Sequence, residues 1–152
     1  MFSKKDAEII SHLRNNARKK ITNISKEMKI PVTTIYDKVR AHEKKYIKKH
    51  VTLLDFQKLG MYARANLEIK VERSSRNALQ KFLVEHPNVN SLSRVDFGSD
   101  FLADVVFKDN GELHGFIEDL ESHYQTQVQI FNVIEELKKE EFLTKPEHFD
   151  AI

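Results

Sequence analysis

Apolar residues recur every three or four positions through the first 45 residues, which predicts three short helices. The first is expected over residues 5–15, the second opens at Thr22, whose hydroxyl can cap a helix start, and the third runs over residues 32–44. Pro31 moves the preceding Ile30 out of helical geometry, so the second helix should end just before that turn. Two short helices joined by a tight turn, after a first helix, match a helix-turn-helix arrangement.

The third helix is predicted to have two unlike faces. At the helical period, Val32, Val39 and His42 fall beside Ile35 on the apolar face. The opposite side and its flanks carry hydroxyl, carboxylate and cationic groups, namely Thr33, Thr34, Tyr36, Asp37, Arg40 and Lys44. Such short donors and acceptors, with an arginine for guanine, are the groups that contact base edges in the major groove. We therefore predict a DNA-reading surface here, to which Thr22 also contributes.

Asp37 is the odd member of this set, because a carboxylate repels phosphate. It is expected either to accept a hydrogen bond from a cytosine amino group or to orient Arg40 or a neighbouring lysine. An ordinary solvent-facing residue is an equal alternative.

The rest of the chain follows a different pattern. Residues 61–72 alternate strictly between apolar and polar, which predicts a strand with one face on a core. The elements expected after it are a helix opening at Ser74 or Ser75 and stopping before Pro87, strands over residues 89–95 and 101–107, a helix over residues 109–120 and a strand over residues 128–137. The fold class is therefore α+β, a winged helix-turn-helix followed by a βαββαβ ferredoxin-like domain.

Four parts follow from these elements: a DNA-binding domain over residues 1–50, a linker over residues 51–60, the ferredoxin-like domain over residues 61–140 and a tail over residues 141–152. The tail is expected to add a short helix or strand at an oligomer edge, or to fray. The second face of the sheet lacks cover within the chain. Leu92, Phe131 and Val133 are expected to line it, and a second subunit should pack there.

Charge separates the two halves more sharply than the net value of +2 suggests. Residues 1–50 contain 14 Lys or Arg against 5 Asp or Glu, which is +9, and the remaining 102 residues contain 11 against 18, which is −7. We predict a polyanion-binding front module, although a solvated lysine face is the commoner meaning of such a run. The expected phosphate contacts are Arg18, Lys19, Lys20, Lys38, Lys44, Lys48 and Lys49. Residues 46–54 are expected to form a β-ribbon wing that carries the last two.

Other compositional features exclude whole classes of function. The chain has no cysteine, which removes disulfides and thiolate chemistry and is typical of a reducing cytoplasm. No apolar run approaches the roughly 20 residues that span a bilayer, and no signal peptide is recognisable. We expect a soluble, cytoplasmic protein that does not bind membranes.

Together these segments resemble the Lrp/AsnC family of leucine-responsive and asparagine-responsive transcription regulators. "DAEIISHLRNNAR" is similar to the opening helix of that family, "IKKHVTLLDFQKLG" to its linker, and "HPNVNSLSRVDFGSDFLADVVF" to its hairpin. The resemblance implies DNA-binding dimers that pair through their C-terminal sheets and often form octamers or other multiples. It also implies a small effector, usually an amino acid, bound at the hairpin turn by Gly98, Ser99 and Asp100.

Three alternatives remain. Siroheme decarboxylases use a similar scaffold, but His50, His86, His114 and His123 are scattered along this sequence. His114, Glu118 and His123 have a spacing at which Zn²⁺ sensing is conceivable, although a plain side-chain pair is commoner. An architectural DNA binder without an effector is the third. We prefer the transcription regulator over these three alternatives, and we expect no enzymatic activity, catalytic residue, metal or cofactor. The expected partners are double-stranded DNA, a second copy of the protein and a small effector.

Overall fold

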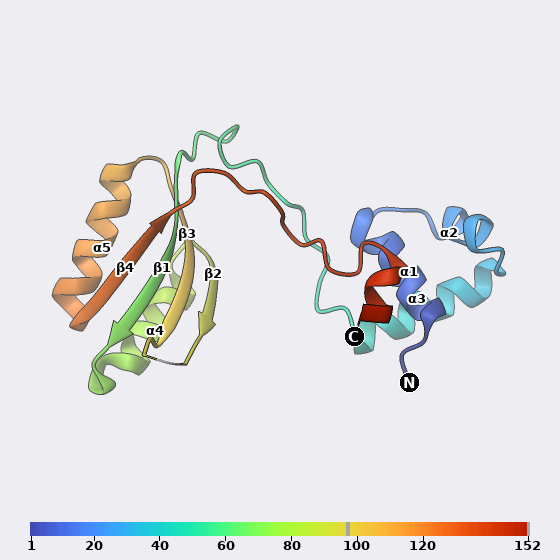
Figure 1. Cartoon of the computed structure of the whole chain (residues 1–152), viewed down its shortest axis with the longest axis horizontal. Helices are drawn as coiled ribbons and strands as arrows, with labels where there is room; N and C mark the ends of the chain where they lie inside the picture. Colours follow the sequence, from blue (N-terminus) through green and yellow to red (C-terminus); the bar gives the residue numbers. More distant parts are fainter. Residues whose placement is uncertain (97, 152) are drawn as a thin grey trace. The chain divides into compact units, whose positions relative to one another are not determined.

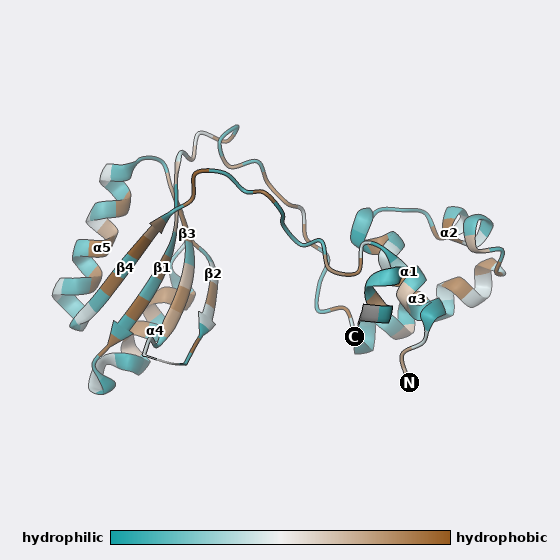
Figure 2. Cartoon of the chain, in the orientation of Figure 1, coloured by the Kyte–Doolittle hydropathy of each residue, from teal (hydrophilic) through white to brown (hydrophobic). Residues whose placement is uncertain are grey.

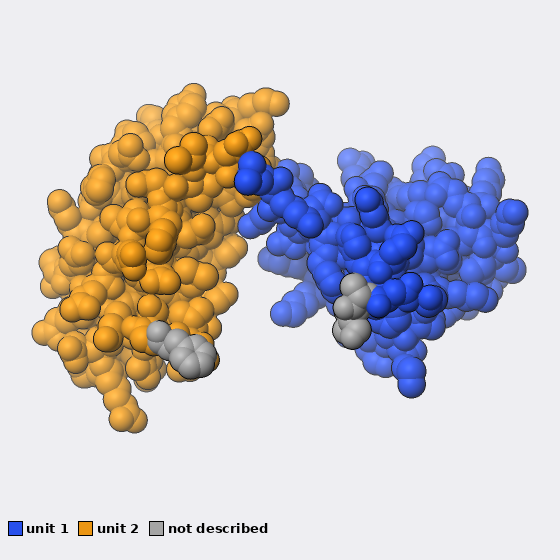
Figure 3. Space-filling view, in the orientation of Figure 1, with its two compact units in different colours: residues 1–53, 137–152 blue, residues 54–136 orange. Residues whose placement is uncertain are grey.

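A computed structural model describes residues 1–96 and 98–151, and it divides the chain into two compact units. Unit 1 contains residues 1–53 and 137–152, and unit 2 contains residues 54–136 (Figures 1 and 3). Unit 1 holds the helix-turn-helix and unit 2 holds the four-stranded sheet, so the predicted α+β class is confirmed. In the part of the chain that is described, no helix combines the length and the hydropathy needed to cross a membrane.

Unit 1 is built from α1 (Lys4–Asn15), α2 (Ile21–Met28) and α3 (Val32–Lys45). The first helix starts with a capping box, in which Ser3 and Asp6 satisfy one another's backbone amides. Ile9, Ile24, Ile35 and Val39 form the buried centre between the three helices. The third helix extends one residue beyond its predicted end. Ile35, Val39 and His42 of its predicted apolar face are buried as expected, but Val32 at its first turn is exposed.

The start of α2 differs from the prediction, and its end agrees with it. Its N-cap is Lys20, whose carbonyl accepts from the amides of Asn23 and Ile24, so Thr22 lies within the first turn and is not the cap. At the other end, the helix stops at Met28, directly before the turn, where Lys29 adopts a left-handed conformation with φ of 55°. The hydroxyl of Ser25 closes this turn by donating to the carbonyl of Ile30.

The predicted wing is wrong, because residues 47–54 form neither helix nor strand. A β-ribbon needs a second strand for its backbone hydrogen bonds, and the described residues of unit 1 contain none. The tail contains a short helix, which is one of the forms expected for it. Residues 137–152 belong to unit 1, and the 3₁₀ helix η2 (Pro146–Ala151) packs against α1 (Figure 1).

Unit 2 has the predicted βαββαβ order. Its elements are β1 (Ala63–Val71), η1 (Arg73–Ser75), α4 (Arg76–Glu85), β2 (Val89–Arg94), β3 (Phe101–Phe107), α5 (Asn110–Tyr124) and β4 (Thr126–Asn132). The strands form one antiparallel sheet in the order β2-β3-β1-β4. Both helices cover the same face of this sheet (Figure 1).

The alternating pattern of β1 decides which side of the sheet is the core. Its odd-numbered positions, Ala63 to Val71, are buried against Leu79 and Leu83 of α4 and Leu113 to Leu120 of α5. Brown and teal positions accordingly alternate along this strand in Figure 2. The even-numbered positions carry polar side chains on the other face, where Arg64 binds the carboxylate of Asp104 through two nitrogens at 3.2 Å each.

Two details of the sheet correct the sequence-based prediction. Leu92 packs against the core cluster on the helix-covered side and does not line the open face. Phe131, by contrast, is 46% exposed and Leu102 of β3 is 41% exposed. The sequence predicts that strand β4 extends to residue 137, but it ends at Asn132, opposite Ala65 of β1. Strand β1 begins at Ala63, so it offers little more backbone for pairing in that direction. The Val133 amide makes one further hydrogen bond, to the Arg64 carbonyl.

Candidate nucleic-acid interface

The exposed side of α3 presents the groups that the sequence analysis placed there. Thr33, Thr34, Tyr36, Asp37, Arg40 and Lys44 are all exposed. The Arg40 guanidinium lies 5.8 Å from the centre of the Tyr36 ring, which restricts the freedom of the arginine. Hydroxyl, phenol, carboxylate and cation thus lie along one accessible helix face, over the buried Ile35 and Val39.

Charge on this face is uncompensated within the protein. In residues 1–96 and 98–151, neither Asp37 nor Arg40 takes part in an ion pair. Lys44, Lys48 and Lys49 form none there either. Arg40 and the three lysines are therefore not bound by a carboxylate of the described residues, although they share this part of the surface with the carboxylate of Asp37.

Lys38 differs from the other predicted phosphate contacts because its ammonium group is 3.0 Å from Asp6. Asp6 is buried at the junction of α1 and α3, and His42 contacts the same Oδ1 atom at 3.0 Å. Burial alone would raise the pKa of Asp6, but hydrogen bonds from Ser3, Lys38 and His42 hold it far below its usual range. This network ties the helix that carries the exposed polar face to α1.

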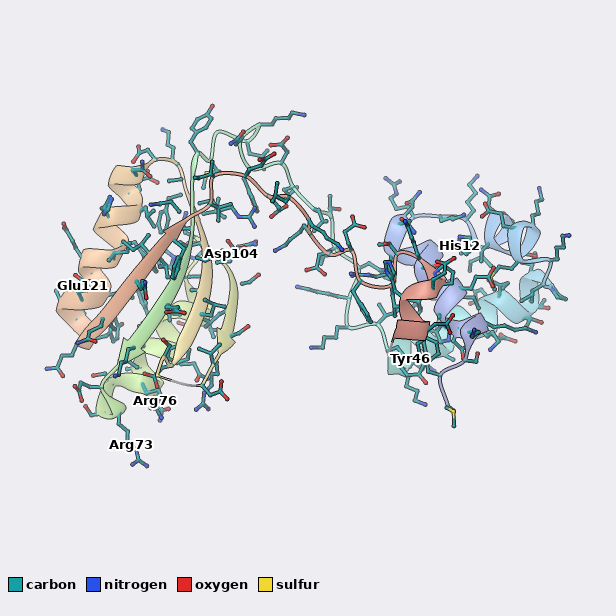
Figure 4. All side chains as sticks on the ribbon, viewed as in Figure 1. His12, Tyr46, Arg73, Arg76, Asp104 and Glu121 are labelled. Carbon is teal, nitrogen blue, oxygen red and sulfur yellow. The ribbon has the colours of Figure 1, made fainter. Side chains whose placement is uncertain are left out.

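An open pocket of about 640 Å³ lies at the turn between α1 and α2. Arg18, Lys19 and Lys20 line it together with His12 (labelled in Figure 4) and three asparagines, Asn15, Asn16 and Asn23. Lys19 is also bound to Glu27 at 2.8 Å, which holds the pKa of that carboxyl below its ordinary value. The lining is therefore a set of amide and cationic donors, with Arg18 and Lys20 exposed.

Asp6, Arg14 and Asn15 are not among the site residues predicted from the sequence. Asp6 carried a readable signal, because Ser3-x-x-Asp6 before an apolar run is a capping box. Arg14 and Asn15 carried none. Their partners are carbonyl oxygens of Glu140, Phe142 and Thr144, more than 120 residues away in the chain.

In unit 2, the three predicted effector residues have different roles. Gly98, with φ of 100°, and Ser99 line a second open pocket of about 340 Å³ beside Glu68 and Lys70 of β1 and the segment 127–129 of β4. Asp100 is not among the residues that line it. Its carboxylate accepts from the Val71 amide at 2.9 Å and from Arg76 (labelled in Figure 4) at 2.8 Å, and so it holds the hairpin to β1 and α4.

The histidines of unit 2 are separated. His86 packs between Phe82 and Phe116, and burial lowers its pKa. His123 is hydrogen-bonded to the carbonyl oxygen of Asp119, which is a local helix contact. Across the described residues, no group of three His, Asp or Glu side chains has the proximity needed to hold a metal ion.

Known proteins of similar sequence include HTH-type transcriptional regulators. The chain is 23% identical over 147 residues to an uncharacterised HTH-type transcriptional regulator of Pyrococcus abyssi, which covers 96% of this chain and all of that protein. It is 25% identical over 114 residues to the HTH-type transcriptional regulator FL11 of Pyrococcus horikoshii, covering 74% of this chain and 76% of that one.

Solved structures share the fold over nearly the whole chain. The transcriptional regulator NMB0573 of Neisseria meningitidis, solved as an L-Met complex, superimposes with a TM-score of 0.83 at 17% identity, covering 91% of this chain and 94% of that one. AsnC of E. coli superimposes with a TM-score of 0.79 at 15% identity, covering 91% and 96%. The profile of the Lrp/AsnC ligand binding domain matches residues 64–142, just over half of the sequence. This chain, with its exposed polar helix in unit 1 and the matched domain in unit 2, therefore belongs to the Lrp/AsnC family of HTH-type transcriptional regulators.

Proposed function

We propose that the protein regulates transcription in the cytoplasm by placing α3 in the major groove of double-stranded DNA. The observation that carries this proposal is the uncompensated polar face of α3, with Arg40 held against Tyr36. Arg40 is the residue suited to a guanine edge, and Thr33 and Thr34 can contact thymine methyl groups or accept and donate hydrogen bonds. Asp37 can accept from a cytosine amino group.

Phosphate contacts come from cations that are not already paired. Arg18 and Lys20 of the pocket at the α1–α2 turn fit this role, as do Lys44, Lys48 and Lys49 after the exposed face. Lys38 and Lys19 contribute less than the sequence suggested, because Asp6 and Glu27 already bind them. Residues 47–54, which form neither helix nor strand, can still place Lys48 and Lys49 along the DNA backbone.

The protein is proposed to act as a homodimer, with higher oligomers such as an octamer as a further state. Two copies would read half-sites about one helical turn apart, or a multiple of that. The partly apolar open sheet face, with Leu102 and Phe131, is the surface that supports pairing.

Unit 2 is proposed to bind a small effector of the amino-acid class. The pocket at Gly98 and Ser99 supplies backbone groups at a left-handed turn and the charged side chains of Glu68 and Lys70, which complement an ammonium and a carboxylate. Asp100 acts by holding the turn in place.

The DNA-binding part is tested by selecting bound sequences from a randomised 30-bp duplex pool with the purified full-length chain. Fluorescence anisotropy then compares the selected duplex with a scrambled one at the same salt concentration. Preference of at least 10³-fold for the selected duplex is expected of a regulator. Equal affinity for both would leave an architectural binder, and no binding even at low salt would refute the proposal.

The effector part is tested separately by thermal unfolding in the presence of each of the 20 amino acids. A ligand at 100 times its Kd should stabilise the chain by about 2.7 kcal/mol. The Gly98→Val variant, which is strained at this φ and fills the turn, should lose the shift. If no amino acid raises the melting temperature of the wild type, this class of effector is excluded.

A further inference from the structure

Arg14, at the end of α1, is held by the C-terminal segment, residues 140–150. Its guanidinium donates to the Glu140 carbonyl at 2.6 Å and to the Phe142 carbonyl at 2.8 Å, and it lies 3.4 Å from the Glu140 carboxylate. The amide of Asn15 donates to the Thr144 carbonyl. Two neighbouring donors of α1 are therefore occupied by one stretch of the C-terminal segment.

The other end of α1 holds the same segment. Lys4 lies 3.0 Å from Asp150, and the rings of Phe2 and Phe149 meet edge to face with their centres 5.0 Å apart. The ring of Phe2 also contacts the rings of His42 and Tyr46 at the end of α3 (Figure 4 labels Tyr46). Phe2 therefore links the C-terminal segment to α3. The segment is thus anchored at both ends of the helix.

An unusual backbone forms the Arg14 contact. Glu140 and Leu143 have φ of 53° and 59°, a left-handed conformation that non-glycine residues rarely adopt. These two residues bracket the chain that carries the carbonyls of Glu140 and Phe142 to Arg14. The contact therefore depends on a backbone conformation that one substitution can permit or forbid.

Asn15 links the segment to the basic pocket. It lines that pocket with Arg18, Lys19 and Lys20, while its amide donates to Thr144 of the C-terminal segment. Residues 140–150 contain four acidic residues and one lysine, which is a charge of −3 with histidine neutral. Like a DNA backbone, the segment thus offers oxygen acceptors and negative charge at the rim of a cationic pocket.

We propose that the C-terminal segment is an intramolecular competitor of the DNA backbone. Docked, it withholds Arg14 and Asn15; released, it lets both residues contact a phosphate next to the one held by Arg18 and Lys20. This inference rests on the proposed binding of DNA and adds two contact residues to it. It also adds an intramolecular inhibition of DNA binding by the docked segment, called the brake below. Any event that detaches the segment then raises affinity for all duplexes alike, because phosphate contacts carry no sequence information.

A matched pair of substitutions at Leu143 tests the brake in the full-length chain. Leu143→Pro forbids a φ of 59°, whereas Leu143→Gly permits it, and both remove the same side chain. Anisotropy titrations of a fluorescein-labelled, random-sequence 30-bp duplex are made between 50 and 300 mM KCl. Leu143→Pro should bind several-fold more tightly than the wild type and steepen the slope of log K against log [KCl] by about 0.9, the value for one additional phosphate neutralised by an arginine. Leu143→Gly should match the wild type.

The double variant Arg14→Ala, Leu143→Pro should have a salt slope about one unit shallower than that of Leu143→Pro alone, because the arginine that the substitution at Leu143 releases is then missing. Phe149→Ala, which removes the distant anchor without touching the backbone near Arg14, should act like Leu143→Pro, and circular dichroism establishes that each variant is folded. Equal or weaker binding by both folded variants, with an unchanged slope, would overturn the brake. A wild type that ignores duplexes would instead refute the proposed function itself.

Discussion

His42 Nε2 lies 3.0 Å from Oδ1 of Asp6, so a buried histidine on α3 is fastened to a buried carboxylate on α1. The same carboxylate accepts from Lys38 and from both the amide and the hydroxyl of Ser3. Four donors around one carboxylate compensate for the cost of removing it from water. The orientation of the proposed reading helix therefore depends on a residue that does not face DNA.

Asp6→Asn should lower the free energy of unfolding at pH 7 by about 2–3 kcal/mol, because charge-assisted hydrogen bonds are lost in a buried position. The folded-state pKa of Asp6 is depressed. Its stabilisation is thus present above the ordinary value of about 3.9 and disappears as the pH falls toward the folded-state pKa. Urea unfolding at pH 7 and pH 3 measures this, and the difference between the two proteins should be smaller at the lower pH. A constant difference at both pH values would contradict the assignment.

Arg40→Ala should weaken binding to the selected duplex by about 1–3 kcal/mol and relax the base preference at one position. The physical reason is loss of the proposed bidentate contact between Arg40 and guanine. Arg73→Ala, which removes an equally exposed arginine from η1 of unit 2, is the matched control and should change nothing. Anisotropy against single-base variants of the duplex is the measurement. Unchanged preference in Arg40→Ala would move the reading surface elsewhere.

Lys48→Ala and Lys49→Ala should each lower the affinity for all duplexes to the same extent. Each should also flatten the slope of log K against log [KCl] by about 0.9, as expected for an exposed phosphate contact. Lys38→Ala should behave differently. Its ammonium is bound to Asp6, so the variant should lose stability and leave the salt slope nearly unchanged. Titrations at four KCl concentrations, combined with urea unfolding, separate the two effects. If Lys38→Ala flattened the slope as much as Lys48→Ala, the ion pair with Asp6 would have to open on binding.

His86 makes unit 2 sensitive to mild acid. Burial among Phe82, Phe107 and Phe116 lowers the pKa of this histidine. The unfolded chain therefore takes up a proton near pH 6.5 that the folded chain resists, and stability falls as the pH drops below that value. His86→Phe keeps a ring in place without a titrating group. Thermal unfolding at pH 7.5 and pH 5.5 should show a smaller loss on acidification in this variant than in the wild type.

Two glycines should respond to alanine in opposite directions. Gly98 has φ of 100° and nothing within 4 Å of an added Cβ, so Gly98→Ala should cost about 1–2 kcal/mol through backbone strain alone. Gly115 lies within α5, and an added Cβ also meets nothing there. Gly115→Ala should therefore stabilise the chain by about 0.5–1 kcal/mol. Thermal or urea unfolding measures both. A neutral Gly98→Ala would mean that the turn relaxes at no cost.

Local sequence rules predicted the elements that depend on local contacts. The limits of α3 follow from Pro31 and helical spacing, and β3 coincides with its apolar run over residues 101–107. Apart from the cap of α2 and the Ser3–Asp6 capping box, which are local, the misses depend on distant partners. No rule of spacing shows that Lys38 meets a carboxylate 32 positions earlier, or that Leu92 faces the helices. The expected wing failed because a strand needs a second strand, which unit 1 does not supply in its described residues.

Unit 1 is assembled from both sides of unit 2 along the chain, since residues 137–152 return to α1. Arg14 and Asn15 therefore take partners that the whole of unit 2 separates from them along the chain. A change confined to residues 137–150 would consequently alter the helix-turn-helix unit and leave the strands of unit 2 as they are.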